Sequence, residues 1–134
     1  MPLPALSPAT AQRWLRYSVA FVWFWTILST GVFSLDEGKA LLDQAGIHGS
    51  LNTALVWTSL GWELLLGTLV LWGRRWTRLL CLVQGATIVF FTGYITLSPG
   101  LRALWVHPFA PVAKNIPILG ALAMLYALGD PEKK

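Results

Sequence analysis

The chain has 134 residues, of which 55% are hydrophobic and only 12% are charged. Soluble domains carry about 25% charged residues, so this composition argues against an ordinary water-soluble protein. The net charge of +4 does not indicate nucleic-acid binding, because the Lys and Arg residues are scattered between long apolar runs and make no basic face. The length is that of one domain. We therefore expect one membrane-embedded domain without a nucleic-acid partner.

Cysteine and histidine are too few for several kinds of cofactor site. Cys81 is the only cysteine, which excludes an intramolecular disulfide, a CxxC pair and a cysteine-rich metal site. His48 and His107 both lie between the apolar runs, which argues against a haem held by paired histidines inside the membrane. The sequence also lacks the glycine fingerprint of a dinucleotide-binding site. We therefore expect no intrinsic cofactor and no metal site.

Four apolar segments predict membrane-spanning helices. A helix needs about 20 apolar residues to cross a hydrocarbon core of about 30 Å, and residues 17–35, 51–72 and 79–98 meet this requirement. The fourth segment, 111–129, begins with a Pro-containing stretch, so we expect a kinked or irregular entry near Pro117. Continuous runs of this length are typical of helices and not of barrel strands. The predicted fold is an all-α membrane protein, an antiparallel four-transmembrane-helix bundle.

The distribution of Lys and Arg predicts the orientation of this bundle. One side carries Arg13, Arg16, Arg74, Arg75, Arg78, Lys133 and Lys134. Cytoplasmic segments of membrane proteins are enriched in Lys and Arg, so we expect both termini to be cytoplasmic. Within the chain we expect a single domain over residues 13–130, a flexible lead over 1–12 and a C-terminal tail over 131–134.

The tryptophans divide into two groups by predicted depth. Trp14, Trp72, Trp76 and Trp105 fall near the expected membrane surfaces, where an amphipathic indole is favoured. The deeper group is Trp23, Trp25, Trp57 and Trp62. These four indoles fit two interpretations: packing against lipid and neighbouring helices, or an aromatic wall for a flat lipophilic ligand such as a quinone.

Glu63 is the only acid within a predicted span. A charge near the bilayer centre costs at least about 2.5–3.5 kcal/mol on insertion scales, so we expect Glu63 to face the bundle interior, either paired or protonated. At about 1.5 Å per helical residue, Glu63 and Thr26 lie about 13 Å from the inner surface and Gln84 about 9 Å, so the three can share one layer. Lys114, about 8 Å farther out than Glu63, could nearly reach it.

The start of the fourth helix adds further candidate residues. Asn115 suits the N-cap of this helix, with Pro117 tolerated in the first turn. The exposed N–H groups there would favour an anionic or carbonyl-bearing ligand. The candidate ligand-binding residues are Glu63, Gln84, Lys114, Asn115, Thr26, Trp23 and Trp62. This polar layer can also be a structural network that fixes the bundle, and we assign no residue a catalytic role.

Small residues predict close packing of the middle helices. Gly67 lies on a small and polar stripe of the second span, in which Ser59, Glu63 and Gly67 recur every four residues. Gly85 and Gly93 are expected to let the third span approach its neighbours.

Three stretches of the chain resemble the DoxX-like membrane proteins. Residues 17–26, continuing into 31–35, resemble the opening span of that family, and residues 41–47 resemble the segment after it. Residues 107–119 are similar to its Pro-rich entry into the last helix, which ends in Lys-Asn-hydrophobic-Pro.

This resemblance implies a multi-pass protein of the bacterial inner membrane with four helices. Members are associated with respiratory or redox membrane complexes, among them a quinone-reducing thiosulfate oxidoreductase. The family often has an acid where this chain has Glu63. A nicotinamide-binding domain, which accompanies some members, would have to be another chain here.

Three functions fit these observations. The first is an accessory subunit of a larger redox or respiratory membrane complex, with no catalytic site of its own and with other membrane subunits or an oxidoreductase as partners. The second is a quinone-binding subunit of a membrane oxidoreductase, in which Lys114, Asn115 and Gln84 hold the quinone and Glu63 relays protons. The third is a small-solute or proton transporter that works as an oligomer. Membrane lipid is a partner in all three.

Overall fold

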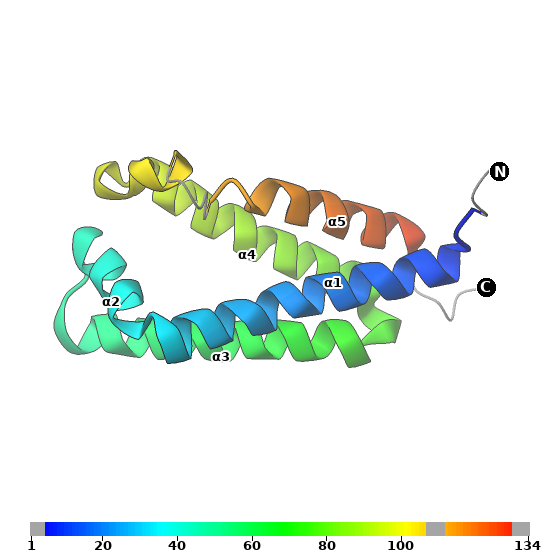
Figure 1. Ribbon diagram of the computed structural model, residues 1–134, viewed down its shortest axis with the longest axis horizontal. Coiled ribbons are helices and arrows are strands. Elements are labelled where there is room, and N and C mark those ends of the chain that lie inside the picture. The colour runs from blue at the N-terminus through cyan, green and yellow to red at the C-terminus, as the bar shows by residue number, and fades with distance from the viewer. Residues whose placement is uncertain (1–4, 107–111, 130–134) are drawn as a thin grey trace.

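The structure, a computed structural model, describes residues 5–106 and 112–129. Within these residues every regular element is a helix. The elements are α1 (Pro8–Leu28), the π-helical turn η1 (Ser29–Phe33), α2 (Leu35–Gln44), α3 (Gly49–Trp72), the 3₁₀ turn η2 (Arg74–Trp76), α4 (Thr77–Leu97), the 3₁₀ segment η3 (Pro99–Trp105) and α5 (Asn115–Leu128). In Figure 1, α1 lies along α3 and α4 lies along α5. The predicted all-α class is confirmed.

The two ends of the molecule differ. At one end, called the inner end below, α1 begins, α5 ends and η2 joins α3 to α4 (Figure 1). At the other, called the outer end, α2 and η3 lie across the tips of the long helices and contact each other. The short α2 is a helix that the hydropathy pattern did not predict.

Two of the described helices are long and apolar enough to cross a membrane, Gly49–Trp72 and the stretch Arg74–Leu97. The first apolar helix passes this test only as the pair Pro8–Phe33 and Leu35–Gln44, which is bent by 93°. The last one, Asn115–Leu128, is apolar but has only 14 residues. The apolar character of the helices is therefore as predicted, whereas four complete spans and the side on which the termini lie stay predictions.

The first helix begins earlier than the predicted span. The Ser7 side chain accepts a hydrogen bond from the backbone N–H of Thr10 at 3.2 Å, and Pro8 occupies the first turn, where no intrahelical donor is needed. The helix therefore includes part of the segment 1–12 that we expected as a flexible lead. Residues 1–4 and the tail 131–134 lie outside the described residues.

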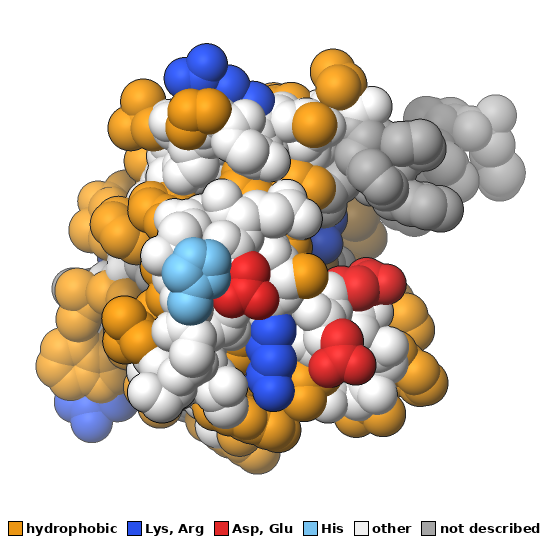
Figure 2. Space-filling model, turned by 90° about the vertical axis from the view of Figure 1, so that its left-hand side faces the viewer, with side chains coloured by type: hydrophobic (Ala, Val, Ile, Leu, Met, Phe, Trp, Pro, Cys, Tyr) orange, Lys and Arg blue, Asp and Glu red, His pale blue; other side chains and the backbone are white. Residues whose placement is uncertain are grey.

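Hydrogen bonds from Asn52 of α3 hold α2 against α3 at the outer end. The side chain of Asn52, which is only 3% exposed, donates from Nδ2 to the carbonyl of Lys39 at 2.8 Å and to Asp43 Oδ1 at 2.9 Å. Asp43 also contacts His48 Nδ1 at 3.1 Å. Figure 2 shows acidic, basic and histidine side chains gathered on this end of the molecule. The polar residues of α2 therefore cap the bundle without entering it.

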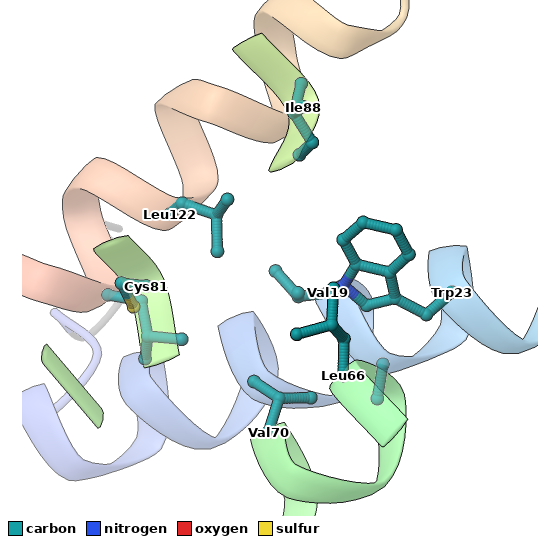
Figure 3. Packing of buried hydrophobic residues seen from close by; sticks show 9 residues of the cluster. Val19, Trp23, Leu66, Val70, Cys81, Ile88 and Leu122 are labelled. Atoms are coloured by element: carbon teal, nitrogen blue, oxygen red, sulfur yellow. The ribbon is translucent and has the colours of Figure 1, made fainter. Parts of the chain in front are cut away.

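The hydrophobic core lies between the two helix pairs (Figure 3). Its members are Val19, Ala20, Trp23, Leu66, Val70, Cys81, Ile88, Leu122 and Leu125. They come from all four long helices, and Leu125 has no exposed surface. Cys81 thus packs inside the core, as expected for a small apolar side chain.

Only one of the predicted packing glycines makes a close approach between helices. A Cβ on Gly67 would lie 3.1 Å from Phe24 Cε1 and 3.1 Å from Trp23 Cβ, so this glycine lets α3 approach α1. A Cβ on Gly85 or Gly93 would meet nothing within 4 Å. The prediction that these two glycines bring α4 close to its neighbours is therefore wrong, because both face open space.

Replacement of Gly67 should separate α1 from α3. We expect Gly67→Leu to lower the free energy of unfolding by about 1–3 kcal/mol, the usual cost of forcing extra atoms into a packed interface. Gly61→Leu is the matched control, because a Cβ on this exposed glycine of the same helix would meet nothing within 4 Å. Thermal unfolding followed by circular dichroism in detergent checks this. Equal loss of stability in both variants would contradict the assigned role of Gly67.

Candidate functional site

Trp23 and Gln84, two of the candidate ligand-binding residues, meet inside the bundle and form a hydrogen bond with each other. The indole Nε1–H of Trp23 donates to Gln84 Oε1 at 2.7 Å, and Gln84 Nε2 donates to the Leu80 carbonyl at 3.0 Å. Gln84 has no exposed surface and Trp23 is 8% exposed. A ligand could reach these groups only by displacing a buried hydrogen bond. The pair therefore serves to join α1 to α4.

Thr26 is not joined to the other members of the predicted layer by a hydrogen bond. Its hydroxyl donates to the carbonyl of Val22 at 2.8 Å, one turn earlier in α1. Threonine in a helix often satisfies its hydroxyl in this way. Similar depth in the membrane thus did not bring Thr26 into a polar contact with Gln84 or Glu63.

Trp62 joins α3 to α4. Its indole Nε1–H donates to Thr87 Oγ1 at 3.2 Å, and the Thr87 hydroxyl donates to the Val83 carbonyl at 2.9 Å. Trp62 is 40% exposed, so one part of the ring faces outward. Of the candidate residues, this indole combines an aromatic surface with access from the membrane.

Glu63 is the unsatisfied member of the layer. Its Oε2 is buried and has no hydrogen-bond partner among the described residues. Lys114 is the cation whose charge acts on this carboxyl group. Within residues 5–106 and 112–129, however, no ion pair within 4 Å joins the two, and Lys114 is exposed. The structure therefore brings Glu63 and Lys114 into electrostatic range without closing the contact.

The start of α5 differs from its prediction in one respect. The N-cap residue is Lys114, whose side chain makes no capping bond, and Asn115 is the first helical residue. Asn115 Nδ2 donates instead to Thr92 Oγ1 on α4 at 3.0 Å. The predicted N-cap role of Asn115 is wrong because Asn115 already belongs to the helix, and its backbone N–H donates to the carbonyl of Val112 at 3.0 Å. Pro117 lies in the first turn, as expected.

The structure also places a buried arginine where the sequence predicted a surface charge. Arg16 is 4% exposed, and its guanidinium donates to the Val70 carbonyl at 2.9 Å and to the Thr77 hydroxyl. The spacing of Gln12, Arg16, Val19 and Trp23 puts them on one face of a helix. That periodicity was the signal that could have identified Arg16 as an inward-facing residue.

The layer thus has a closed part and an open part. Trp23 with Gln84, and Asn115 with Thr92, are hydrogen-bonded pairs that join helices. Among the residues 5–106 and 112–129, Glu63 Oε2 has no hydrogen-bond partner and Lys114 forms no ion pair within 4 Å, and the ring of Trp62 is partly exposed. The described residues contain no group of three or more His, Cys, Asp or Glu side chains that could hold a metal. The chemistry available here is hydrogen bonding and proton transfer.

An all-helical chain with long apolar helices and a small interior polar layer defines a small membrane protein. The family model of the DoxX-like family matches residues 20–123, and the chain belongs to that family. No curated protein and no solved structure matches it.

A double-mutant cycle should measure the buried pair of Trp23 and Gln84. We expect Trp23→Phe and Gln84→Leu each to destabilise the protein, because each leaves one buried polar group unpaired, at a cost of about 1–3 kcal/mol. The double variant should be more stable than the sum of the two losses predicts, by about 0.6–1.7 kcal/mol. Unfolding in mixed micelles supplies the free energies.

Trp25→Phe is the control for this cycle, because Trp25 lies on the same helix and is 55% exposed. It should show no coupling with Gln84→Leu. Strict additivity of Trp23→Phe and Gln84→Leu would show that the hydrogen bond does not stabilise the bundle.

Proposed function

We propose that the protein is an accessory subunit of a larger redox or respiratory complex in the bacterial inner membrane. The observation that carries this proposal is the buried Oε2 of Glu63, which has no partner among the described residues. A buried acid in a membrane helix is costly unless it is protonated, paired or bonded to a ligand. Unsatisfied buried groups of this kind often mark a site that another molecule completes.

The proposed topology is an antiparallel bundle of four spans with both termini in the cytoplasm. It is supported by the beginning of α1 and the end of α5 at the inner end (Figure 1). The exposed Arg13, Arg74 and Arg78 belong to the same end, which fits the enrichment of basic residues on the cytoplasmic side. Lys133 and Lys134, which we counted toward the same side, lie outside the described residues.

Quinone binding is the second candidate function. Gln84 and Asn115 are already hydrogen-bonded to Trp23 and Thr92, so neither is the first choice for holding a quinone carbonyl. Lys114 and a protonated Glu63 are the remaining donors, and the exposed part of Trp62 offers a flat apolar surface. A quinone would enter from the membrane and form a hydrogen bond with the carboxyl group of Glu63. A protein partner would form that hydrogen bond with one of its own side chains. For the transport alternative no contact of the described residues gives specific support.

Loss of the Glu63 carboxylate should weaken retention of a partner. In membranes solubilised with a mild detergent, we expect part of the wild-type protein to migrate in a larger assembly that contains an oxidoreductase. Glu63→Gln removes the charge at nearly constant volume and should reduce that fraction several-fold. Glu37→Gln, an exposed acid in the first turn of α2, should leave it unchanged. Migration of the wild type only as a 14.8 kDa protomer or a homo-oligomer would contradict the subunit proposal.

A titration with quinone distinguishes quinone binding from retention of a partner protein. If a quinone completes the site, menaquinone or ubiquinone added to the protein in nanodiscs should quench its tryptophan fluorescence in a saturable way. Lys114→Met and Trp62→Leu should weaken the apparent affinity, and Trp57→Leu, an exposed tryptophan of the same helix, should not. Absence of saturable quenching in the wild type would remove this candidate and leave the subunit proposal standing.

A further inference from the structure

An apolar groove runs between α4 and α5 toward the outer end. Its lining residues are Val89, Thr92, Gly93, Thr96, Leu97 and Leu119, and its volume is about 420 Å³. The groove is open on one side, since its lining residues Val89 and Leu97 are 58% and 77% exposed. Gly93 contributes to the hollow, because a Cβ there would meet nothing within 4 Å.

The two threonines of the groove already use their hydroxyl oxygens in the protein. Thr92 Oγ1 accepts from Asn115 Nδ2 at 3.0 Å. Thr96 Oγ1 accepts from the indole of Trp105 at 2.9 Å and donates to the Thr92 carbonyl at 2.7 Å. The remaining lining side chains are aliphatic or absent. The groove therefore fits a hydrocarbon chain much better than a polar head group.

A cation lies at the outer limit of the same groove. Arg102 Nε donates to the carbonyl of Thr96, a lining residue, at 2.9 Å, which fixes the guanidinium beside the last turn of α4. Among the described residues, neither terminal nitrogen of Arg102 has a hydrogen-bond or ion-pair partner, and the side chain is exposed. A guanidinium held in this way can offer two parallel N–H groups to a phosphate. Trp105, on the same segment, suits a position at the membrane surface.

We propose that the groove binds one acyl chain of an anionic phospholipid, whose phosphate is held by Arg102. The arrangement matches the order of groups in a lipid: the charged group lies at the outer end and the apolar groove extends inward from it. A head group with no positive charge of its own leaves the attraction to Arg102 uncompensated, which favours phosphatidylglycerol over phosphatidylcholine. This site is separate from Glu63 and does not depend on the accessory-subunit proposal.

Native mass spectrometry of the full chain, titrated with phosphatidylglycerol in a mild detergent, tests the site. Arg102→Gln should weaken binding of the first lipid about fivefold, the effect of one surface arginine near an anionic lipid. Lys39→Gln, a cation of α2 at the same end, is the control and should have little effect. Gly93→Leu and Leu97→Trp, which fill the groove from two of its lining positions, should weaken binding of the long-chain lipid but not of dihexanoyl phosphatidylglycerol. Gly61→Leu is the control for added bulk on a helix.

Three results would overturn the proposal. The first is an equal effect of Arg102→Gln and Lys39→Gln on the first lipid bound. The second is unchanged long-chain binding in both groove variants while circular dichroism shows them folded. The third is displacement of phosphatidylglycerol by menaquinone at equal concentration, which would identify the groove as the place of a quinone tail. Because none of these measurements involves Glu63, their failure would leave the proposed function untouched.

Discussion

The arrangement of the long helices depends on a buried arginine at the inner end. Arg16 of α1 bonds to the Val70 carbonyl near the end of α3 and to the Thr77 hydroxyl at the start of α4, and Thr77 donates to the Arg74 carbonyl in the connecting turn. The last carbonyls of a helix have no partner within the helix and carry partial negative charge, so a cation there is favourable. One side chain thereby fixes α1 against both arms of the α3–α4 hairpin, and α5 then packs on α1 and α4.

The interior of the bundle has two regions, which differ in whether their polar groups are hydrogen-bonded. Next to it lies the core, where the one large polar pair, Trp23 with Gln84, is fully satisfied. Farther out, Glu63 Oε2 has no hydrogen-bond partner among the described residues, and the apolar groove between α4 and α5 is open. Closing a buried polar pair contributes about 0.6 kcal/mol on average in a membrane protein, which is less than the cost of leaving a charge unpaired at depth. The outer region is therefore the part of the bundle that gains most from a second molecule.

The sequence predicted the apolar helices, because long apolar runs leave few alternatives. It offered Trp23 and Gln84 as separate candidates and did not pair them, since depth along a helix does not determine which side chains meet. It did not predict α2, since a short amphipathic helix lying across the bundle has no hydropathy signal of a span. It misplaced Arg16 because a count of basic residues treats each one as a surface charge, although helical periodicity put Arg16 on the buried face. The prediction for Gly93 was wrong because it depends on which neighbour that face of α4 meets, and this cannot be read from a single sequence. The prediction for Asn115 was wrong because a sequence does not fix the first residue of a helix.

The groove and the acid lie on different helices, since the groove is lined by α4 and α5 and Glu63 belongs to α3. Gly93 faces open space on α4, whereas Gln84 of the same helix contacts Trp23, and at 3.6 residues per turn these two positions lie on opposite faces of α4. The groove therefore opens to lipid, while Glu63 on α3 approaches Lys114 at the start of α5. A partner at Glu63 and a lipid at Arg102 would not compete for one volume. The bundle can therefore hold a lipid on its surface and still present the carboxyl group of Glu63 to another molecule, because the groove is lined by α4 and by Leu119 of α5, whereas Glu63 belongs to α3.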